Sequence, residues 1–109
     1  MTTSTTAPVP IRIRALVRDG VAEVRLLMPH PMETGLRLDG TGTPVPAHHI
    51  TEVVASVGTR TVFAAQLSFA VSRDPLLAFR FSGARVGDRL RVRWTDSRGD
   101  QRSDDATLA

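Results

Sequence analysis

The feature that most constrains the fold is an alternation of apolar and polar residues with a period of two. In residues 89–95, Leu90, Val92 and Trp94 alternate with arginines. This period places successive side chains on opposite faces of the backbone, so each such segment predicts a strand with one buried face. Strands are predicted in this way at residues 11–17, 21–28, 50–57, 61–67, 77–81, 89–95 and 101–108.

Turn-forming residues separate these segments at close spacing, and Asp19-Gly20 predicts a hairpin between the first two. A helix over residues 53–70 is disfavoured by β-branched residues and by Gly58. We therefore expect an all-β protein, an antiparallel β-sandwich of about seven strands. Its predicted core comprises Val24, Leu26, Phe63, Leu67, Phe69, Phe79, Phe81, Leu90, Val92 and Trp94.

The length of 109 residues fits one domain that can bury a core without disulfides. We place that domain at residues 11–109, after a Thr-rich and Pro-rich segment at residues 1–10 that is expected to be flexible. The absence of cysteine excludes a disulfide scaffold, a thiolate metal site and a cysteine nucleophile within the chain. No apolar run approaches the ~18 residues of a spanning helix, and the first residues do not have the pattern of a secretory signal.

All fourteen basic residues are arginines, yet the net charge is only +3, which is a weak basis for predicting a polyanionic partner. Residues 80–93 hold five arginines and one acid, and they are the strongest candidate for a nucleic-acid surface. Single-strand binders also need aromatic side chains on the basic face, but Trp94 is predicted to face inward and tyrosine is absent. A solvated strand face is the preferred interpretation, and a free-standing module that binds an acidic protein or nucleic acid is the alternative.

The segment at residues 29–47 departs from the hairpin pattern. It contains four prolines and three glycines, which predict a loop of close to twenty residues. Connections in compact domains usually have ~2–6 residues, and much longer ones are usually functional or disordered. This segment is therefore the first place to look for a site.

Three histidines and one glutamate are the candidates for chemistry. His30 and Glu33 could form a proton-transfer pair, but nothing beside them completes a catalytic set. His48 and His49 could bind a metal ion, with His30 as a further ligand, but adjacent strand residues point to opposite faces and the spacing fits no zinc pattern. We expect no catalytic residue, no cofactor and no metal site.

The same loop carries a resemblance to a known family. Pro29-His30-Pro31-Met32-Glu33-Thr34-Gly35-Leu36-Arg37, followed by Asp39, Gly42, Val45-Pro46 and Ile50, closely resembles the SoxZ family. Further similarity lies at residues 21–25, at Phe63, at Asp74-Pro75 and at Trp94-Thr95-Asp96 with Gly99, so that it covers about residues 10–108. Ala47 departs from the family, which often has a basic residue there.

The resemblance implies an immunoglobulin-like β-sandwich that is not an enzyme. SoxZ-like chains pair with a SoxY-like protein whose C-terminal Gly-Gly-Cys-Gly-Gly arm carries sulfur intermediates on its cysteine. The heterodimer carries them between enzymes of the periplasmic thiosulfate-oxidising system, to which it docks transiently. By this resemblance the chain is periplasmic and is exported with its signal-bearing partner. A companion without a thiol of its own avoids competing exchange reactions.

Within this resemblance, we expect the loop to bind the partner through His30, Met32, Glu33, Thr34 and Arg37, all exposed. Arg37 and the outward arginines of the strands could also steer an anionic cargo or an acidic client. The alternative is that Glu33 and Thr34 only satisfy backbone groups of the loop.

Overall fold

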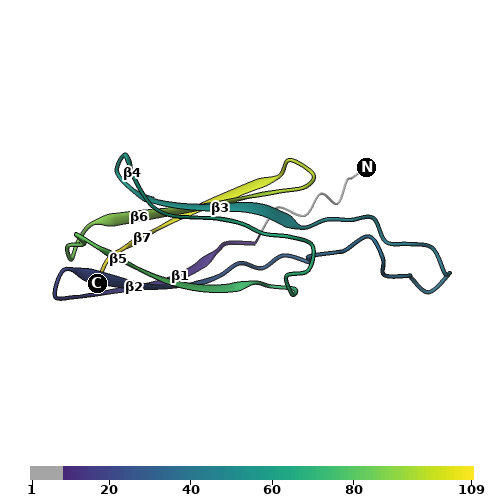
Figure 1. Ribbon diagram of the computed structural model, residues 1–109, viewed down its shortest axis with the longest axis horizontal. Helices are drawn as coiled ribbons and strands as arrows, with labels where there is room; N and C mark the ends of the chain where they lie inside the picture. The colour runs from purple at the N-terminus through teal and green to yellow at the C-terminus, as the bar shows by residue number, and fades with distance from the viewer. Residues whose placement is uncertain (1–8) are drawn as a thin grey trace.

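The computed structural model describes residues 9–109, in which seven strands are joined without a helix (Figure 1). Each expected strand is present, with ends within one residue of those expected. The expected flexible segment at residues 1–10 lies almost wholly outside the described residues. Residues 9–109 contain no helix long and apolar enough to cross a membrane. The strands are β1 (Arg12–Arg18), β2 (Val21–Leu27), β3 (Ile50–Val57), β4 (Arg60–Gln66), β5 (Leu76–Ser82), β6 (Arg89–Asp96) and β7 (Gln101–Thr107).

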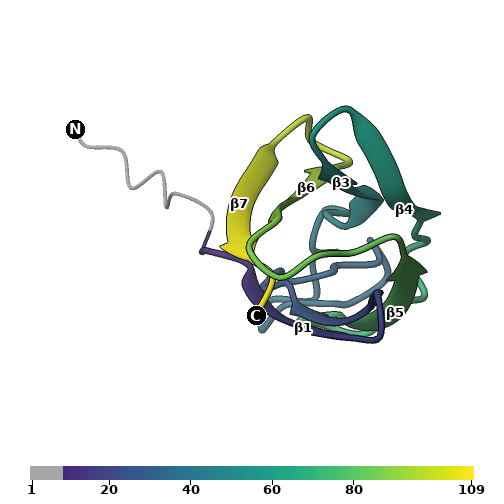
Figure 2. The ribbon, with the colours of Figure 1, turned by 90° about the vertical axis from the view of Figure 1, so that its left-hand side faces the viewer.

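The strands form two antiparallel sheets packed face to face (Figures 1 and 2). One sheet has the order β1-β2-β5, and the other has the order β4-β3-β6-β7. The chain therefore changes sheet after β2, after β4 and after β5. Two packed antiparallel sheets linked by such crossovers form an immunoglobulin-like β-sandwich, which confirms the predicted fold class.

The two sides of the sandwich are closed differently. On the side of β1 and β7, the backbone of Ala109 bonds to that of Val17 at 2.9 Å and of Ala15 at 3.2 Å. On the side of β4 and β5, side chains make the link: the rings of Phe63 and Phe79 stack at 4.3 Å between centroids. Figure 2 shows β4 and β5 together on one side of the sandwich. Strands β4 and β5 are thus the unpaired edges of their sheets.

The core lies between the sheets and follows the predicted alternation. Leu26, Leu90 and Val92 have no exposed surface, and Trp94 is also buried. The prediction that Phe69 belongs to the core is wrong, because half of this residue is exposed. It follows the end of β4, where the alternation of a strand no longer fixes which way a side chain points.

Residues 28–49, the projecting segment, connect β2 to β3 and extend from one end of the sandwich (Figure 1). Its two arms run antiparallel and are joined by isolated bridges between Glu33 and His48 and between Leu38 and Pro44. The prediction of a long connection here is confirmed. The segment begins and ends beside the end of β6, and this brings together the side chains described next.

Candidate functional site

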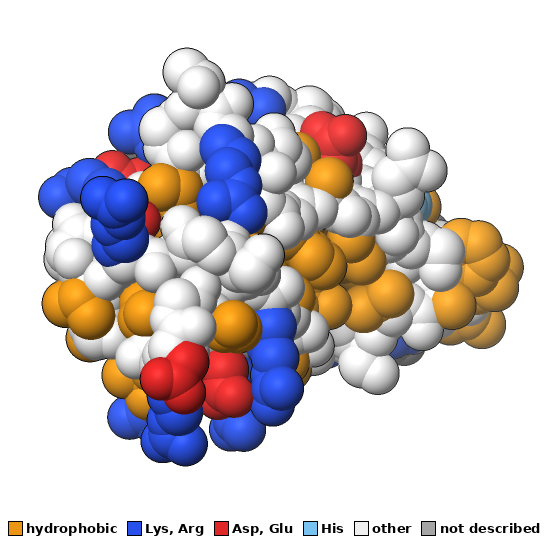
Figure 3. All heavy atoms as spheres, turned by 60° about the vertical axis from the view of Figure 1, so that its left-hand side comes forward, with side chains coloured by type: hydrophobic (Ala, Val, Ile, Leu, Met, Phe, Trp, Pro, Cys, Tyr) orange, Lys and Arg blue, Asp and Glu red, His pale blue; other side chains and the backbone are white. Residues whose placement is uncertain are grey.

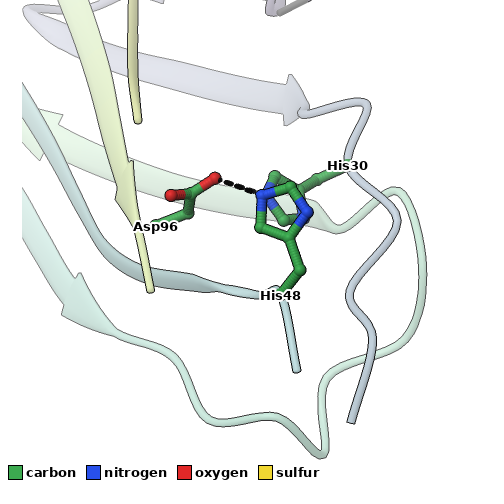
Figure 4. Close-up of side chains that lie close together, drawn as sticks. All are labelled: His30, His48 and Asp96. Carbon is green, nitrogen blue, oxygen red and sulfur yellow. Dashed lines mark hydrogen bonds and ion pairs between the residues drawn. The ribbon is translucent and has the colours of Figure 1, made fainter. Parts of the chain in front are cut away.

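Three polar side chains meet where the projecting segment joins the sandwich (Figure 4). His30 follows β2, His48 precedes β3, and Asp96 is the last residue of β6. The Nε2 atoms of His30 and His48 lie 3.0 Å and 2.7 Å from the same carboxylate oxygen, Oδ2 of Asp96. We call this arrangement the His–Asp–His cluster. It ties both ends of the projecting segment to one strand of the larger sheet.

Asp96 is buried but well supplied with donors. Its other oxygen, Oδ1, accepts the backbone N–H groups of Arg98 and Asp100 at 3.0 and 2.9 Å, which closes the turn between β6 and β7. Burial alone would raise the pKa of Asp96, but the hydrogen bonds from His30, His48 and these amides lower it below its usual value. Asp96 is therefore a buried carboxylate held in its charged form.

His30 is held as a neutral imidazole with a defined tautomer. Its Nδ1 accepts the backbone N–H of Met32 at 3.1 Å, so the ring proton lies on Nε2 and is donated to Asp96. Burial lowers the pKa of His30, and this effect outweighs the opposing hydrogen bond to Asp96. The backbone of His30 is also fixed, because its N–H donates to Oδ1 of Asp74 at 2.9 Å. His30 therefore connects the projecting segment, β6 and the loop before β5.

The cluster has the composition of a metal site but not its hydrogen-bond pattern. Its three ligand atoms lie within 4.8 Å of one another, and two imidazoles with one carboxylate are common ligands of transition metals. A metal ion at Nε2 of His30 would need the ring proton on Nδ1, where it would face the Met32 N–H, donor against donor. The geometry therefore favours a carboxylate that holds two imidazole donors over a metal site.

His49 does not join the cluster. Its backbone N–H donates to the hydroxyl of Ser97 at 3.1 Å, and its ring lies edge-on to Phe69 at 6.4 Å. The side chains of His48 and His49 thus have different surroundings, Asp96 for His48 and Phe69 for His49. The third member of the cluster, Asp96, was not predicted, because it lies 66 residues from His30 in the chain. Its only local signal is its position before the turn whose amides it accepts.

Met32 and His30 were expected to be exposed. In the structure both are buried, and each is only 5% accessible. Met32 has a positive φ of 48°. Its sulfur accepts the backbone N–H of Ile50 at 3.3 Å, so this side chain packs against the start of β3. The two residues fix the base of the projecting segment, and the expectation of their exposure is wrong.

Glu33, Thr34 and Arg37 lie further out on the projecting segment. Arg37 donates to both carboxylate oxygens of Glu33, at 2.6 and 3.0 Å, in an exposed ion pair. This hydrogen bond from Arg37 lowers the pKa of Glu33. The hydroxyl of Thr34 accepts the N–H of Leu36 at 3.0 Å, as the backbone-satisfying alternative predicted. The pair of His30 and Glu33 considered for proton transfer does not form, since each side chain has a different partner.

A hollow of about 490 Å³ lies beside the cluster. Arg73, Asp74 and Asp100 line it together with the cluster, and His48 is the most accessible of the three cluster members. The described residues that line the hollow include no serine, threonine or cysteine that an imidazole could activate. The arrangement positions backbone and holds charge, and it does not form a nucleophile–base pair.

Comparison of the fold with solved structures finds similar sandwiches at low sequence identity. A superoxide reductase in the oxidised state is 12% identical, with a TM-score of 0.66 and coverage of 99% of this chain and 94% of the other. A superoxide reductase (neelaredoxin) variant from Archaeoglobus fulgidus is 18% identical, with a TM-score of 0.65 and coverage of 100% and 96%. A hypothetical protein from Pyrococcus horikoshii is 13% identical, with a TM-score of 0.66 and coverage of 100% and 96%. At these identities the similarity shows the fold alone.

Sequence comparison is more specific. The chain has no significant match among curated proteins. Residues 11–107 match the family described as "Sulphur oxidation protein SoxZ", which covers all seven strands and the whole projecting segment. The chain therefore belongs to the SoxZ family of sulphur oxidation proteins.

Proposed function

We propose that this chain is the non-catalytic half of a sulfur carrier. Its partner is a SoxY-like chain whose C-terminal Gly-Gly-Cys-Gly-Gly arm holds intermediates of thiosulfate oxidation on its cysteine. The heterodimer carries these intermediates from one enzyme to the next. The observation that carries the proposal is the family match over nearly the whole chain, residues 11–107.

The geometry of the cluster supports a scaffolding role. His30 and Asp96 are the buried polar residues of the described chain, and their hydrogen bonds serve to hold the projecting segment on the sandwich. A catalytic imidazole needs a lone pair or proton directed at a substrate. In His30 the Met32 amide and Asp96 occupy both ring nitrogens.

The absence of cysteine fits the same role. Thiol–disulfide exchange proceeds by attack of a thiolate on a bound sulfur atom. A scaffold that carried its own thiol beside the arm of its partner would compete for the cargo. The chain contains no cysteine, so it offers no thiol that could take the cargo from the partner.

We assign the permanent partner to the side of the sandwich formed by β4 and β5. Both strands are sheet edges with unpaired backbone groups, and unpaired edges are natural sites for adding a strand. Phe63 and Phe79 are only partly buried between them, and Figure 3 shows hydrophobic side chains gathered between the two sheets on this side. Permanent interfaces are the more apolar class, which suits this surface.

The exposed part of the projecting segment is assigned to the arm and its clients. Glu33 and Arg37 hold each other in a fixed orientation, and Leu36 and Leu38 beside them are exposed by 77% and 58%. A polar pair flanked by exposed leucines has the composition of a small docking surface. The heterodimer would act in the periplasm, to which its partner carries it.

The alternative function, a module that binds nucleic acid, would need arginines on β6 that are free to contact phosphate. Arg89 and Arg91 both donate to the carboxylate of Asp105 on β7, each at 3.0 Å. The shared carboxylate cancels part of the positive charge of these two arginines and so reduces their attraction for phosphate. This part of the basic surface therefore gives no support to the alternative.

Co-expression with the SoxY-like chain tests the proposal. We expect the two chains to co-elute in a one-to-one ratio and the complex to restore thiosulfate oxidation to a mixture of the enzymes that lacks it. The isolated chain should show no turnover of thiosulfate. A folded chain that elutes apart from its SoxY-like partner, or isolated chain that turns over thiosulfate, would contradict the assignment. Cell fractionation with and without the partner tests the periplasmic location.

A further inference from the structure

The outer surface of the β1-β2-β5 sheet is unusually basic. Because side chains alternate along a strand, every second residue of these strands faces away from the core. The strand register aligns these outward residues in rows across the sheet. We call this surface the arginine face. Its basic residues are Arg12, Arg14, Arg18, Arg25 and Arg80, and its acid is Glu23.

Most of these arginines have no internal counter-charge. Arg80 lies 3.1 Å from Glu23, but the other four make no ion pair within residues 9–109. Arg14 lies directly opposite Arg25 in the register of β1 and β2. Like charges at directly opposed positions destabilise a sheet, so this pair costs the isolated chain stability. An external negative charge would remove that cost.

The other sheet shows that an excess of arginine does not by itself leave charges uncompensated. There Arg89 and Arg91 of β6 share the carboxylate of Asp105, and Arg102 pairs with Asp104 within β7 at 2.8 Å. In that sheet three arginines have a partner carboxylate, whereas on the arginine face only Arg80 has one. Figure 3 shows basic side chains, with acidic ones among them, on the lower side of the molecule, where Figure 1 places β1, β2 and β5.

The arginine face also has an apolar floor. A shallow hollow of about 400 Å³ is lined by Arg12, Arg14 and Arg25 together with Leu27 and Leu76. Leu76 is 71% exposed, an unusual degree for a leucine in a strand. A hollow with apolar walls and three cations at its rim is suited to an apolar side chain flanked by carboxylates.

We propose that the arginine face docks transiently on an acidic protein surface, one apolar side chain of which enters the hollow between Leu27 and Leu76. Charge complementarity selects this occupant, because four uncompensated cations on one face require anions opposite them. Permanent interfaces have few charged residues at their centre, whereas complexes formed through charged surfaces associate and dissociate quickly. A single-stranded nucleic acid is less suited, since no aromatic side chain lies among the outward residues of these three strands.

The inference that the partner surface is acidic depends only on the arginine face. The further inference that this partner is an enzyme served by the carrier rests on the proposed function. The first experiment therefore uses the isolated chain and a probe, a peptide of repeating Glu-Glu-Leu units, followed by nuclear magnetic resonance. We expect shifts confined to the rows of β1, β2 and β5 that contain Arg12, Arg14, Arg25 and Leu76. Affinity should fall at least about tenfold between about 0.05 M and about 0.5 M salt.

Two charge-reversal variants make the test specific. Arg14→Glu with Arg25→Glu should weaken binding of the peptide about tenfold or more. Arg85→Glu with Arg93→Glu changes the net charge equally but lies off this face, and it should retain the affinity. Equal loss in both variants, shifts spread over both sheets, or tighter binding of a single-stranded oligonucleotide on the same rows would overturn the proposal.

The second experiment uses the complete heterodimer as the substrate of its enzymes. For Arg14→Glu with Arg25→Glu we expect the KM for the carrier to rise about tenfold at low salt while kcat is unchanged, and the control variant to behave as the wild type. If the heterodimer forms and the KM is unchanged, docking at this face is wrong and the proposed function stands. If the wild-type chain forms no heterodimer, the proposed function is wrong, and the peptide experiment alone then decides whether the arginine face binds an acidic surface.

Discussion

The Nε2 atom of His48 lies 2.7 Å from Oδ2 of Asp96, beside the pair of Ile50 and Asp96 at the end of the ladder between β3 and β6. The same carboxylate oxygen receives His30 from the end of β2. One buried aspartate therefore organises three chain segments that are distant in sequence. Both ends of the projecting segment are attached to the larger sheet through this residue.

Replacing Asp96 by alanine should lower the free energy of unfolding by about 3–5 kcal/mol, because it leaves the buried His30 donor and two turn amides without an acceptor. Urea unfolding followed by circular dichroism measures the effect. Asp100→Ala, an exposed change in the same turn, is the control and should cost far less. A similar small loss in both variants would show that the cluster does not hold the segment.

Stability should fall as the pH drops below about 6.5, the ordinary pKa of histidine. Burial lowers the pKa of His30 in the folded chain, so between the folded and unfolded pKa values the unfolded chain binds the extra proton and is favoured. The contribution is complete above about pH 6.5 and is lost on acidification through the folded pKa. Denaturant titrations across this range should show the slope in the wild type and a shallower one in His30→Gln. An equal slope in both would assign the effect to other groups.

Met32 should behave as a core residue in spite of its place in a loop. Met32→Ala is expected to cost about 2–5 kcal/mol of unfolding free energy, and Met32→Leu less than about 1.5 kcal/mol. Met28→Ala, a fully buried methionine at the start of the same segment, is the matched comparison. If Met32→Ala costs nothing while Met28→Ala costs several kcal/mol, the contact of Met32 with Ile50 contributes no stability.

Divalent zinc should not raise the melting temperature at concentrations near that of the protein. The Nδ1 of His30 already accepts the Met32 amide, so its Nε2 holds a proton and offers no lone pair to a metal ion. Thermal unfolding with and without added zinc measures this directly, since a ligand of the folded state raises the melting temperature. A rise that disappears in Asp96→Asn would mean that the cluster binds zinc after the amide of Met32 has moved.

Arg37→Ala should change the docking of the heterodimer and not the stability of the chain. The ion pair with Glu33 is exposed, and such pairs contribute little to folding. We expect an unchanged midpoint of urea unfolding and a reduction of about threefold to tenfold in the affinity for the enzymes of the system. Thr34→Ala is the comparison, because its hydroxyl caps the backbone of Leu36 within the segment. Unchanged turnover together with a lower midpoint would assign Arg37 a structural role only.

The strands were predictable because a strand with one buried face has an apolar residue at every second position. In β6, Leu90, Val92 and Trp94 are buried between exposed arginines, as their spacing alone indicates. The cluster was not predictable in the same way. His30 and Asp96 meet only because two sheets pack, and no local pattern encodes a contact over 66 residues. Met32 was expected to be exposed because it lies in a loop rich in proline and glycine, but its side chain packs inward against the start of β3.

Both ends of the projecting segment are fastened to a single oxygen atom. Loss of this one contact therefore weakens the attachment of both arms together, while each arm keeps a backbone bond of its own, from His30 to Asp74 and from His49 to Ser97. In hydrogen exchange, the amides paired between the arms, such as those of Glu33 and His48, should open together as one cooperative unit that is distinct from the sandwich.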